Sequence, residues 1–327
     1  MRRRRVGDTP VEVSGIGFGC WIAGDGLGGS HENALRLMRS AFERGITFFD
    51  CDGSGDGREE ELLSRFLKGL RRDQVQIGAR FGSASEAQPA QPPGRSGRDL
   101  SPEAMRAELE RLLRRLGSDH IDIYLVRDIK LPEFRDDLFG EFEKARAEGK
   151  IGTWGVSLGP GIGWREEGIR AMMDHGAKAV QTVYSLLEQD PGREFCDVGR
   201  AYRAGIIARN HDCGGILRKS DQVRFAGVRK YADAHGMTAR QLAYRWLLMD
   251  PAVASIAATL ANEEEIIEAV EAVDRPALAP QEMRRIAEDY AEDWGLGPEA
   301  HPRDLASSTS PTGKVRSGYV PPPVMLA

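Results

Sequence analysis

The chain has 327 residues and a formal net charge of −5, with 41% hydrophobic and 29% charged residues. This composition is typical of a globular protein, and its charge provides no overall attraction to nucleic acid or to an anionic membrane. No apolar run approaches the roughly 20 residues of a membrane span. The four cysteines have no paired spacing, so we expect reduced thiols in a cytoplasmic protein.

Apolar runs typical of strands alternate along the chain with segments of helical periodicity. The predicted strands are 11–20, 46–51, 75–82, 121–127, 151–158, 179–187, 205–212 and 253–260. The predicted helices between and after them are 32–45, 58–71, 101–116, 131–150, 163–176, 192–204, 222–236, 238–249 and 262–273. Repeated βα units predict an α/β fold, a (β/α)8 TIM barrel, and favour it over an open doubly wound sheet. We expect one barrel domain over 1–295, including a further helix from 281, and a tail over 296–327 that packs on the barrel or is partly disordered.

In such a barrel the chemistry lies where the strands end. Asp50 ends the second predicted strand, and Arg80, Arg127 and Arg209 end others. These guanidinium groups favour a pocket for a small anionic substrate, with a structural ion-pair network as the alternative. The full set of candidate substrate-binding residues is Arg80, Arg127, Arg209, Asp52, Trp21 and Cys51. Metal binding by nearby carboxylates and histidine follows no known ligand spacing, so we predict no metal site.

His211 is the one histidine at the C-terminal end of a predicted strand. An unperturbed imidazole pKa of about 6.5 suits proton transfer near neutrality. We therefore predict His211 as the catalytic acid or base, oriented by Asp50 or Asp212; the alternative is a solvated loop residue. Cys51 and Cys213 flank this region, either as activated thiols or, more often for such residues, as small packing residues.

Read together, the segments VSGIGFGCW, GITFFD, EGKIGTWGVS, VQTVYSLLE and GIIARNHDCGGIL resemble the aldo/keto reductases. The resemblance implies a barrel with a nicotinamide cofactor across its C-terminal face and a Tyr acid supported by Asp, Lys and His. Asp50 matches the Asp, whereas Gly55 stands at the Tyr position, and Arg80 and Arg127 replace the Lys and the His. Because a guanidinium group does not give up its proton, the usual acid is missing.

The resemblance also assigns cofactor-binding roles. Ser157 and Gln181 match the residues that hold the carboxamide, and Tyr184 matches the aromatic residue under the nicotinamide ring. The segment that normally binds the adenosine 2′-phosphate carries no cation here and contains Glu263–Glu265, which repel a phosphate. We therefore expect no NAD(P)H binding, or weak binding only.

Three hypotheses follow. The first is a divergent enzyme that acts on a small anionic metabolite by proton transfer, as an isomerase, lyase or cyclase. The second is an NAD(P)H-dependent oxidoreductase in which His211 replaces the tyrosine acid. The third is a non-catalytic binding or regulatory barrel. The sequence predicts neither a nucleic-acid nor a membrane partner and leaves the oligomeric state open.

Overall fold

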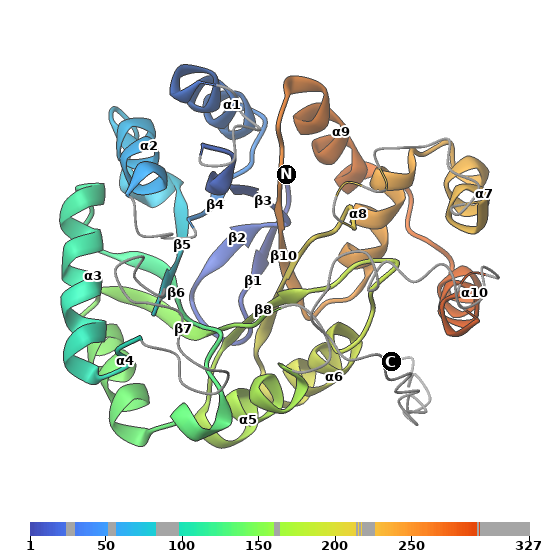
Figure 1. The fold of residues 1–327 in the computed structure, drawn as a ribbon. Helices are drawn as coiled ribbons and strands as arrows, with labels where there is room; N and C mark the ends of the chain where they lie inside the picture. Colours follow the sequence, from blue (N-terminus) through green and yellow to red (C-terminus); the bar gives the residue numbers. More distant parts are fainter. Residues whose placement is uncertain are drawn as a thin grey trace.

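Eight parallel strands form a closed barrel, which confirms the predicted fold class (Figure 1). The computed structural model describes residues 1–23, 30–51, 57–82, 98–159, 164–213, 215, 217, 226–292 and 294. Around the barrel the strands follow the order β10-β3-β4-β5-β6-β7-β8-β9. Their bounds are β3 (Ile16–Gly19), β4 (Phe48–Asp50), β5 (Gln76–Phe81), β6 (Ile121–Arg127), β7 (Ile151–Ser157), β8 (Ala179–Val183), β9 (Gly205–Arg209) and β10 (Val253–Ala258).

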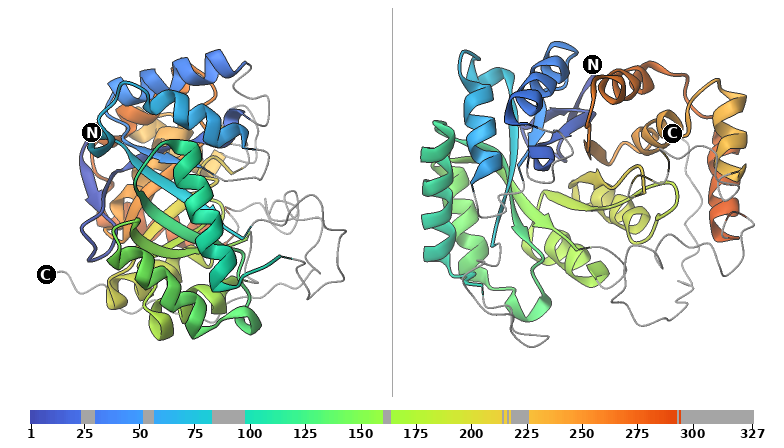
Figure 2. Two further views of the ribbon diagram at one scale, coloured as in Figure 1. Left: turned by 90° about the vertical axis from the view of Figure 1, so that its left-hand side faces the viewer. Right: turned by 45° about the horizontal axis from the view of Figure 1, so that its top comes forward.

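Helices surround the strands (Figure 2). They are α1 (His31–Glu43), α2 (Arg58–Leu67), α3 (Pro102–Leu116), α4 (Asp136–Ala147), α5 (Arg165–His175), α6 (Gly192–Tyr202), α7 (Ala226–Ala234), α8 (Ala239–Met249), α9 (Glu263–Asp274) and α10 (Pro280–Ala291). Local signals explain α3 well. The Ser101 side chain accepts from the backbone N–H of Ala104, proline occupies the first turn, and Gly117 ends the helix at φ 64°.

The N-terminal segment differs from the sequence expectation. The predicted single strand 11–20 is divided into β2 (Glu12–Ser14) and β3, and β2 pairs with the preceding β1 (Arg3–Arg5) in an antiparallel hairpin. Val13 packs with the lumen residues Phe48 and Leu125, so the hairpin closes one end of the barrel. Arg4 fixes it there by donating to the carbonyls of Val253, Leu248 and Asp250.

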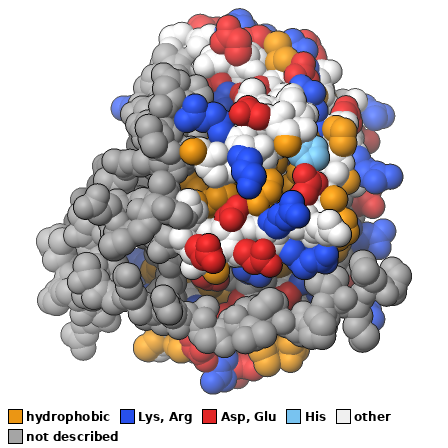
Figure 3. All heavy atoms as spheres, turned by 90° about the vertical axis from the view of Figure 1, so that its right-hand side faces the viewer, with side chains coloured by type: hydrophobic (Ala, Val, Ile, Leu, Met, Phe, Trp, Pro, Cys, Tyr) orange, Lys and Arg blue, Asp and Glu red, His pale blue; other side chains and the backbone are white. Residues whose placement is uncertain are grey.

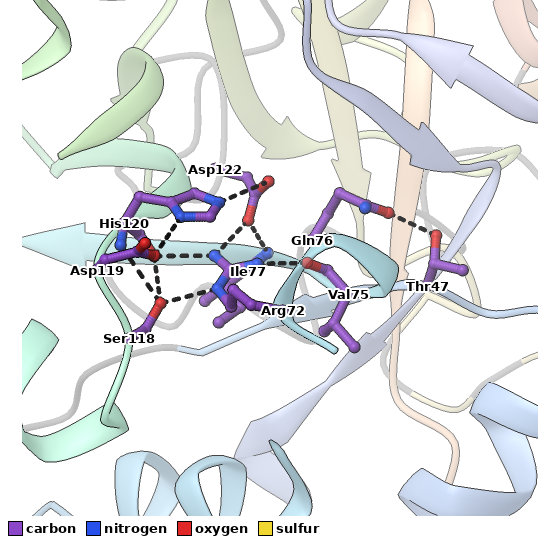
Figure 4. Close-up of polar contacts among 9 residues, drawn as sticks. All are labelled: Thr47, Arg72, Val75, Gln76, Ile77, Ser118, Asp119, His120 and Asp122. Carbon is purple, nitrogen blue, oxygen red and sulfur yellow. Dashed lines mark hydrogen bonds and ion pairs between the residues drawn. The ribbon is translucent and has the colours of Figure 1, made fainter. Parts of the chain in front are cut away.

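Arg72 joins several segments at the N-terminal end of the barrel (Figure 4). Its guanidinium donates to Ser118 Oγ at 2.7 Å, to the His120 carbonyl at 2.8 Å and to Asp122 Oδ2 at 2.7 Å. The same Asp122 oxygen accepts from the Ile77 N–H at 2.8 Å. Since this end of a barrel carries stability rather than chemistry, Arg72 is a structural cross-link.

β8 and β9 end several residues before their predicted ends. β9 ends at Arg209 because Asn210 and Cys213 have φ values of 57° and 55°, which turn the backbone out of the strand. β8 ends at Val183, ahead of a turn in which Ser185 and Glu188 pair. No helix in the described part of the chain is long and apolar enough to cross a membrane. The predicted tail, 296–327, lies outside the described residues.

Candidate active site

The C-terminal ends of the strands present polar side chains to the barrel interior. Side chains alternate across a strand, so every second residue faces the lumen. Phe48 and Ala179 belong to the apolar cluster inside the barrel, and Asp50 and Gln181 follow two positions later on the same strands. The polar layer therefore lies directly on an apolar layer.

Arg80 is the centre of this layer. Its Nη2 donates to Asp50 Oδ2 at 2.6 Å, and the two side chains are only 1% and 0% exposed. Its Nε donates to Ser157 Oγ at 3.1 Å, and its Nε and Nη2 donate to Gln181 Oε1 at 2.8 and 2.5 Å. Gln181 completes the ring by donating from Nε2 to Asp50 Oδ2 at 2.8 Å. We call Asp50, Arg80, Ser157 and Gln181 the Arg80 cluster.

The geometry of the Arg80 cluster corresponds to the ion-pair alternative for Arg80. Its guanidinium is committed to a carboxylate and two neutral oxygens, so it does not stand open for an anion shared with Arg127. Space for the cluster comes from Gly78, where a Cβ atom would lie 2.9 Å from Asp50 Oδ1. That buried oxygen accepts no hydrogen bond from any described residue.

The remaining cationic residues lie at the barrel rim. Arg127 and Arg209 are half-buried, and Arg209 donates to the Leu158 carbonyl. Arg98, which the sequence analysis missed, donates to the carbonyls of Arg127 and Asp128 at 2.5 and 2.6 Å. Nothing in the sequence marks Arg98, because it follows a long segment with no periodicity.

Trp21 lies near the same end of the barrel and is half-buried. Its Nε1 donates to Thr259 Oγ1 at 2.9 Å. Asp52 and Gly55 lie outside the described residues.

His211 lies beyond the end of β9 and is 1% exposed. Its ring stacks on Tyr244 of α8, with centroids 4.2 Å apart and an interplanar angle of 23°. Since α8 packs outside the barrel against β10 and α9, the imidazole contacts the helical layer. The expected orienting contact between Asp50 and His211 is not present: Asp50 Oδ2 accepts from Arg80 and Gln181, and Oδ1 accepts from no described residue. Asp212 is also buried.

The eight-stranded barrel agrees with the comparison to known proteins. The profile described as "Aldo/keto reductase family" matches residues 15–291. The chain belongs to the aldo/keto reductase family.

Individual relatives and solved structures are similar to different shares of the chain. "Probable aldo-keto reductase 1" of Glycine max is 32% identical over 62% of the chain, which spans 57% of that relative. "Uncharacterized oxidoreductase YqkF" of Bacillus subtilis is 24% identical over 90% of the chain and 98% of its own length. The holo form of the aldo-keto reductase AKR11C1 from Bacillus halodurans shares the fold, with a TM-score of 0.72, 23% identity and coverage of 88% of this chain and 96% of its own.

The cofactor-binding residues assigned by resemblance to the aldo/keto reductases have the right chemical groups for a nicotinamide carboxamide, but these groups are already hydrogen-bonded within the protein. A hydroxyl and an amide, on Ser157 and Gln181, suit a carboxamide chemically. In this structure, however, Arg80 already donates to both side-chain oxygens. Tyr184 is buried, with its ring edge-to-face against Trp246 at 5.2 Å between centroids. The groups therefore fit the amide only once Arg80 has left them.

The acidic segment at the start of α9 forms salt bridges with arginine side chains that come from outside α9. Glu263 Oε1 accepts from Ser40 Oγ at 2.5 Å and from Arg44 Nη2 at 2.8 Å, both from the α1 region. Glu265 pairs with Arg240 of α8 at 3.0 Å. The segment itself contains no Lys or Arg. The cations that other helices bring to it, Arg44 and Arg240, are paired with its glutamates. Acidic and basic side chains are likewise interspersed on the face seen in Figure 3.

The thiols have the properties of packing residues. None of the four cysteines forms a disulfide, and all four are buried. Burial raises the pKa of Cys213 to about 12, although the Ser185 hydroxyl partly offsets the effect. A protonated, buried thiol is a poor nucleophile. The described residues also contain no group of three His, Cys, Asp or Glu side chains suited to a metal ion.

Proposed function

We propose that the protein is a cytoplasmic oxidoreductase that uses NADH with a small carbonyl substrate, and that Arg80 stabilises the substrate oxygen in place of a tyrosine acid. Family membership and the presence of Ser157, Gln181 and Tyr184 support the redox assignment. The observation that carries the role of Arg80 is its guanidinium, buried in the barrel and held by Asp50 at 2.6 Å.

The cofactor, when bound, supplies a hydride to the carbonyl carbon. Asp50 holds Arg80 through Nη2, and once the guanidinium has left Ser157 and Gln181, the N–H groups released there donate to the oxygen as negative charge develops. Because guanidinium stays protonated, with a pKa above about 12, it stabilises the alkoxide without protonating it, and water provides the proton. Lack of a general acid costs about 10²–10⁴ in rate, so we expect slow turnover.

NADH oxidation in the presence of 4-nitrobenzaldehyde or a 2-oxo acid tests this proposal. We expect slow oxidation that the paired variant Arg80→Met/Asp50→Asn abolishes while the fold is retained. Oxidation that is absent in the wild type, or unchanged in that variant, contradicts it.

A second candidate is proton transfer on a small anionic metabolite, in an isomerase, lyase or cyclase reaction without a cofactor. The guanidinium groups of Arg127 and Arg209 at the barrel rim favour it, because they suit a carboxylate or phosphate. In this proposal His211 exchanges the proton, which requires its ring to leave Tyr244, and Asp212 assists. Deuterium exchange into 2-oxo acids without NADH would support it. Failure of both assays leaves a non-catalytic binding barrel.

A further inference from the structure

We propose that the Arg80 guanidinium occupies the side-chain oxygens of Ser157 and Gln181, which would otherwise bind the carboxamide of a nicotinamide cofactor. The guanidinium and the carboxamide therefore exclude one another. That the excluded ligand is a nicotinamide carboxamide rests on the proposed function. That Arg80 occupies Ser157 and Gln181 rests on the hydrogen bonds within the Arg80 cluster.

The contacts define what a carboxamide must displace. Arg80 donates to Gln181 Oε1 twice, at 2.8 and 2.5 Å, and to Ser157 Oγ at 3.1 Å. Ser157 Oγ in turn donates to Gln181 Oε1 at 2.8 Å. The NH₂ group of a carboxamide needs these same acceptor oxygens. Since charged donors form stronger hydrogen bonds than neutral ones, the guanidinium is the stronger competitor.

This competition lowers the apparent affinity for the cofactor. When the binding-competent state is only a fraction of the population, the apparent dissociation constant rises by the inverse of that fraction. The ion pair with Asp50 can persist as Arg80 leaves the other two residues, so opening does not strand a buried carboxylate. The nicotinamide end of a dinucleotide therefore contributes little to binding in the wild-type protein.

Arg80→Lys separates the two roles of Arg80. A lysine is a compact charge on a flexible stem, so it can neutralise Asp50 but lacks the planar fork that reaches Ser157 and Gln181 together. Arg72→Lys is the matched control. Arg72 also bridges several segments through its guanidinium, with its side chain 20% exposed, but at the opposite end of the barrel (Figure 4).

The experiment compares NADH with ADP-ribose, which lacks the nicotinamide, by titration of tryptophan fluorescence. In the wild type and in Arg72→Lys we expect the two dissociation constants to agree within about threefold, a difference of less than about 0.7 kcal/mol. In Arg80→Lys we expect NADH to bind at least about tenfold more tightly than ADP-ribose. Circular dichroism and thermal unfolding check that both variants are folded.

A wild-type protein that prefers NADH to ADP-ribose by tenfold or more overturns the proposal, even if Arg80→Lys fails to fold. Folded Arg80→Lys with no gain for NADH also overturns it. The proposed function fails separately: a gain in NADH binding by Arg80→Lys, together with no NADH oxidation by the wild type, retains the occupancy of Arg80 and removes the reductase assignment.

Discussion

Arg80 and Asp50 lie on neighbouring strands and form a salt bridge of 2.6 Å that is sealed from water on both sides. A charge removed from water is stable only if its partner and its hydrogen bonds remain. The pair therefore binds β4 to β5 and, through Gln181, crosses the barrel to β8.

The first prediction concerns this pair. Arg80→Met leaves the Asp50 carboxylate buried without a counterion, and we expect it to lower the free energy of unfolding by about 3–5 kcal/mol. Arg80→Met/Asp50→Asn removes both charges and should recover most of that loss. Urea denaturation measures both values. A double variant as unstable as the single one would show that packing, rather than charge, dominates.

The second prediction concerns the choice of dinucleotide. The cations near the start of α9 are already bound by its glutamates, as Arg44 is by Glu263. Lack of a charge-assisted contact to the 2′-phosphate costs roughly 1.5–3 kcal/mol, so NADPH should bind about ten- to a hundredfold more weakly than it would with such a contact in place. Fluorescence titration should give no NADPH dissociation constant in the low micromolar range, and NADH should be penalised less. Tight NADPH binding would refute this.

The third prediction separates the roles of His211. In the proton-transfer proposal, His211→Gln lowers deuterium exchange into the substrate by about 10²–10⁴. Tyr244→Leu removes only the stacking partner of His211 and should change exchange much less. Both variants lose stability, since an aromatic pair contributes about 0.5–1.5 kcal/mol beyond burial. Equal falls in exchange would assign His211 to packing alone.

The fourth prediction is that the native thiols do not react. Burial raises the pKa of Cys20, Cys196 and Cys213, and Cys51 is fully buried as well. At about pH 8 the native protein should therefore give almost no colour with Ellman's reagent, because the thiolate is the reactive form. Addition of guanidinium chloride should release all four thiols. Rapid labelling of one thiol in the native state would revive the activated-cysteine hypothesis.

The fifth prediction concerns acid stability. Hydrogen bonds from Ser40 and then Arg44 lower the pKa of Glu263 below its ordinary value. A depressed carboxyl pKa contributes stability above the unfolded value, about 4.3, and the contribution is lost as pH falls through the folded pKa. Glu263→Gln should therefore be less stable than wild type at neutral pH, and the two urea midpoints should converge in acid. Parallel curves across that range would argue against the linkage.

Local patterns in the sequence determined the barrel. The period of two in strands and the near-four period in helices depend on a few neighbouring residues, and caps such as Ser101 and Gly117 act within one turn. For the same reason the sequence identified Asp50, Arg80, Ser157 and Gln181 as residues near strand ends, each from its own strand.

Only the tertiary structure decided what these residues do to one another. Hydrogen bonds join Arg80 to Gln181 across 101 positions of the chain, and no local pattern records such a contact. The turn that starts at Asn210 directs His211 to Tyr244 of α8, although alternation along an extended strand would have placed it differently. Periodicity specifies which face a residue occupies, whereas partners across a closed barrel depend on strand order, register and space, which exist only once the chain has folded.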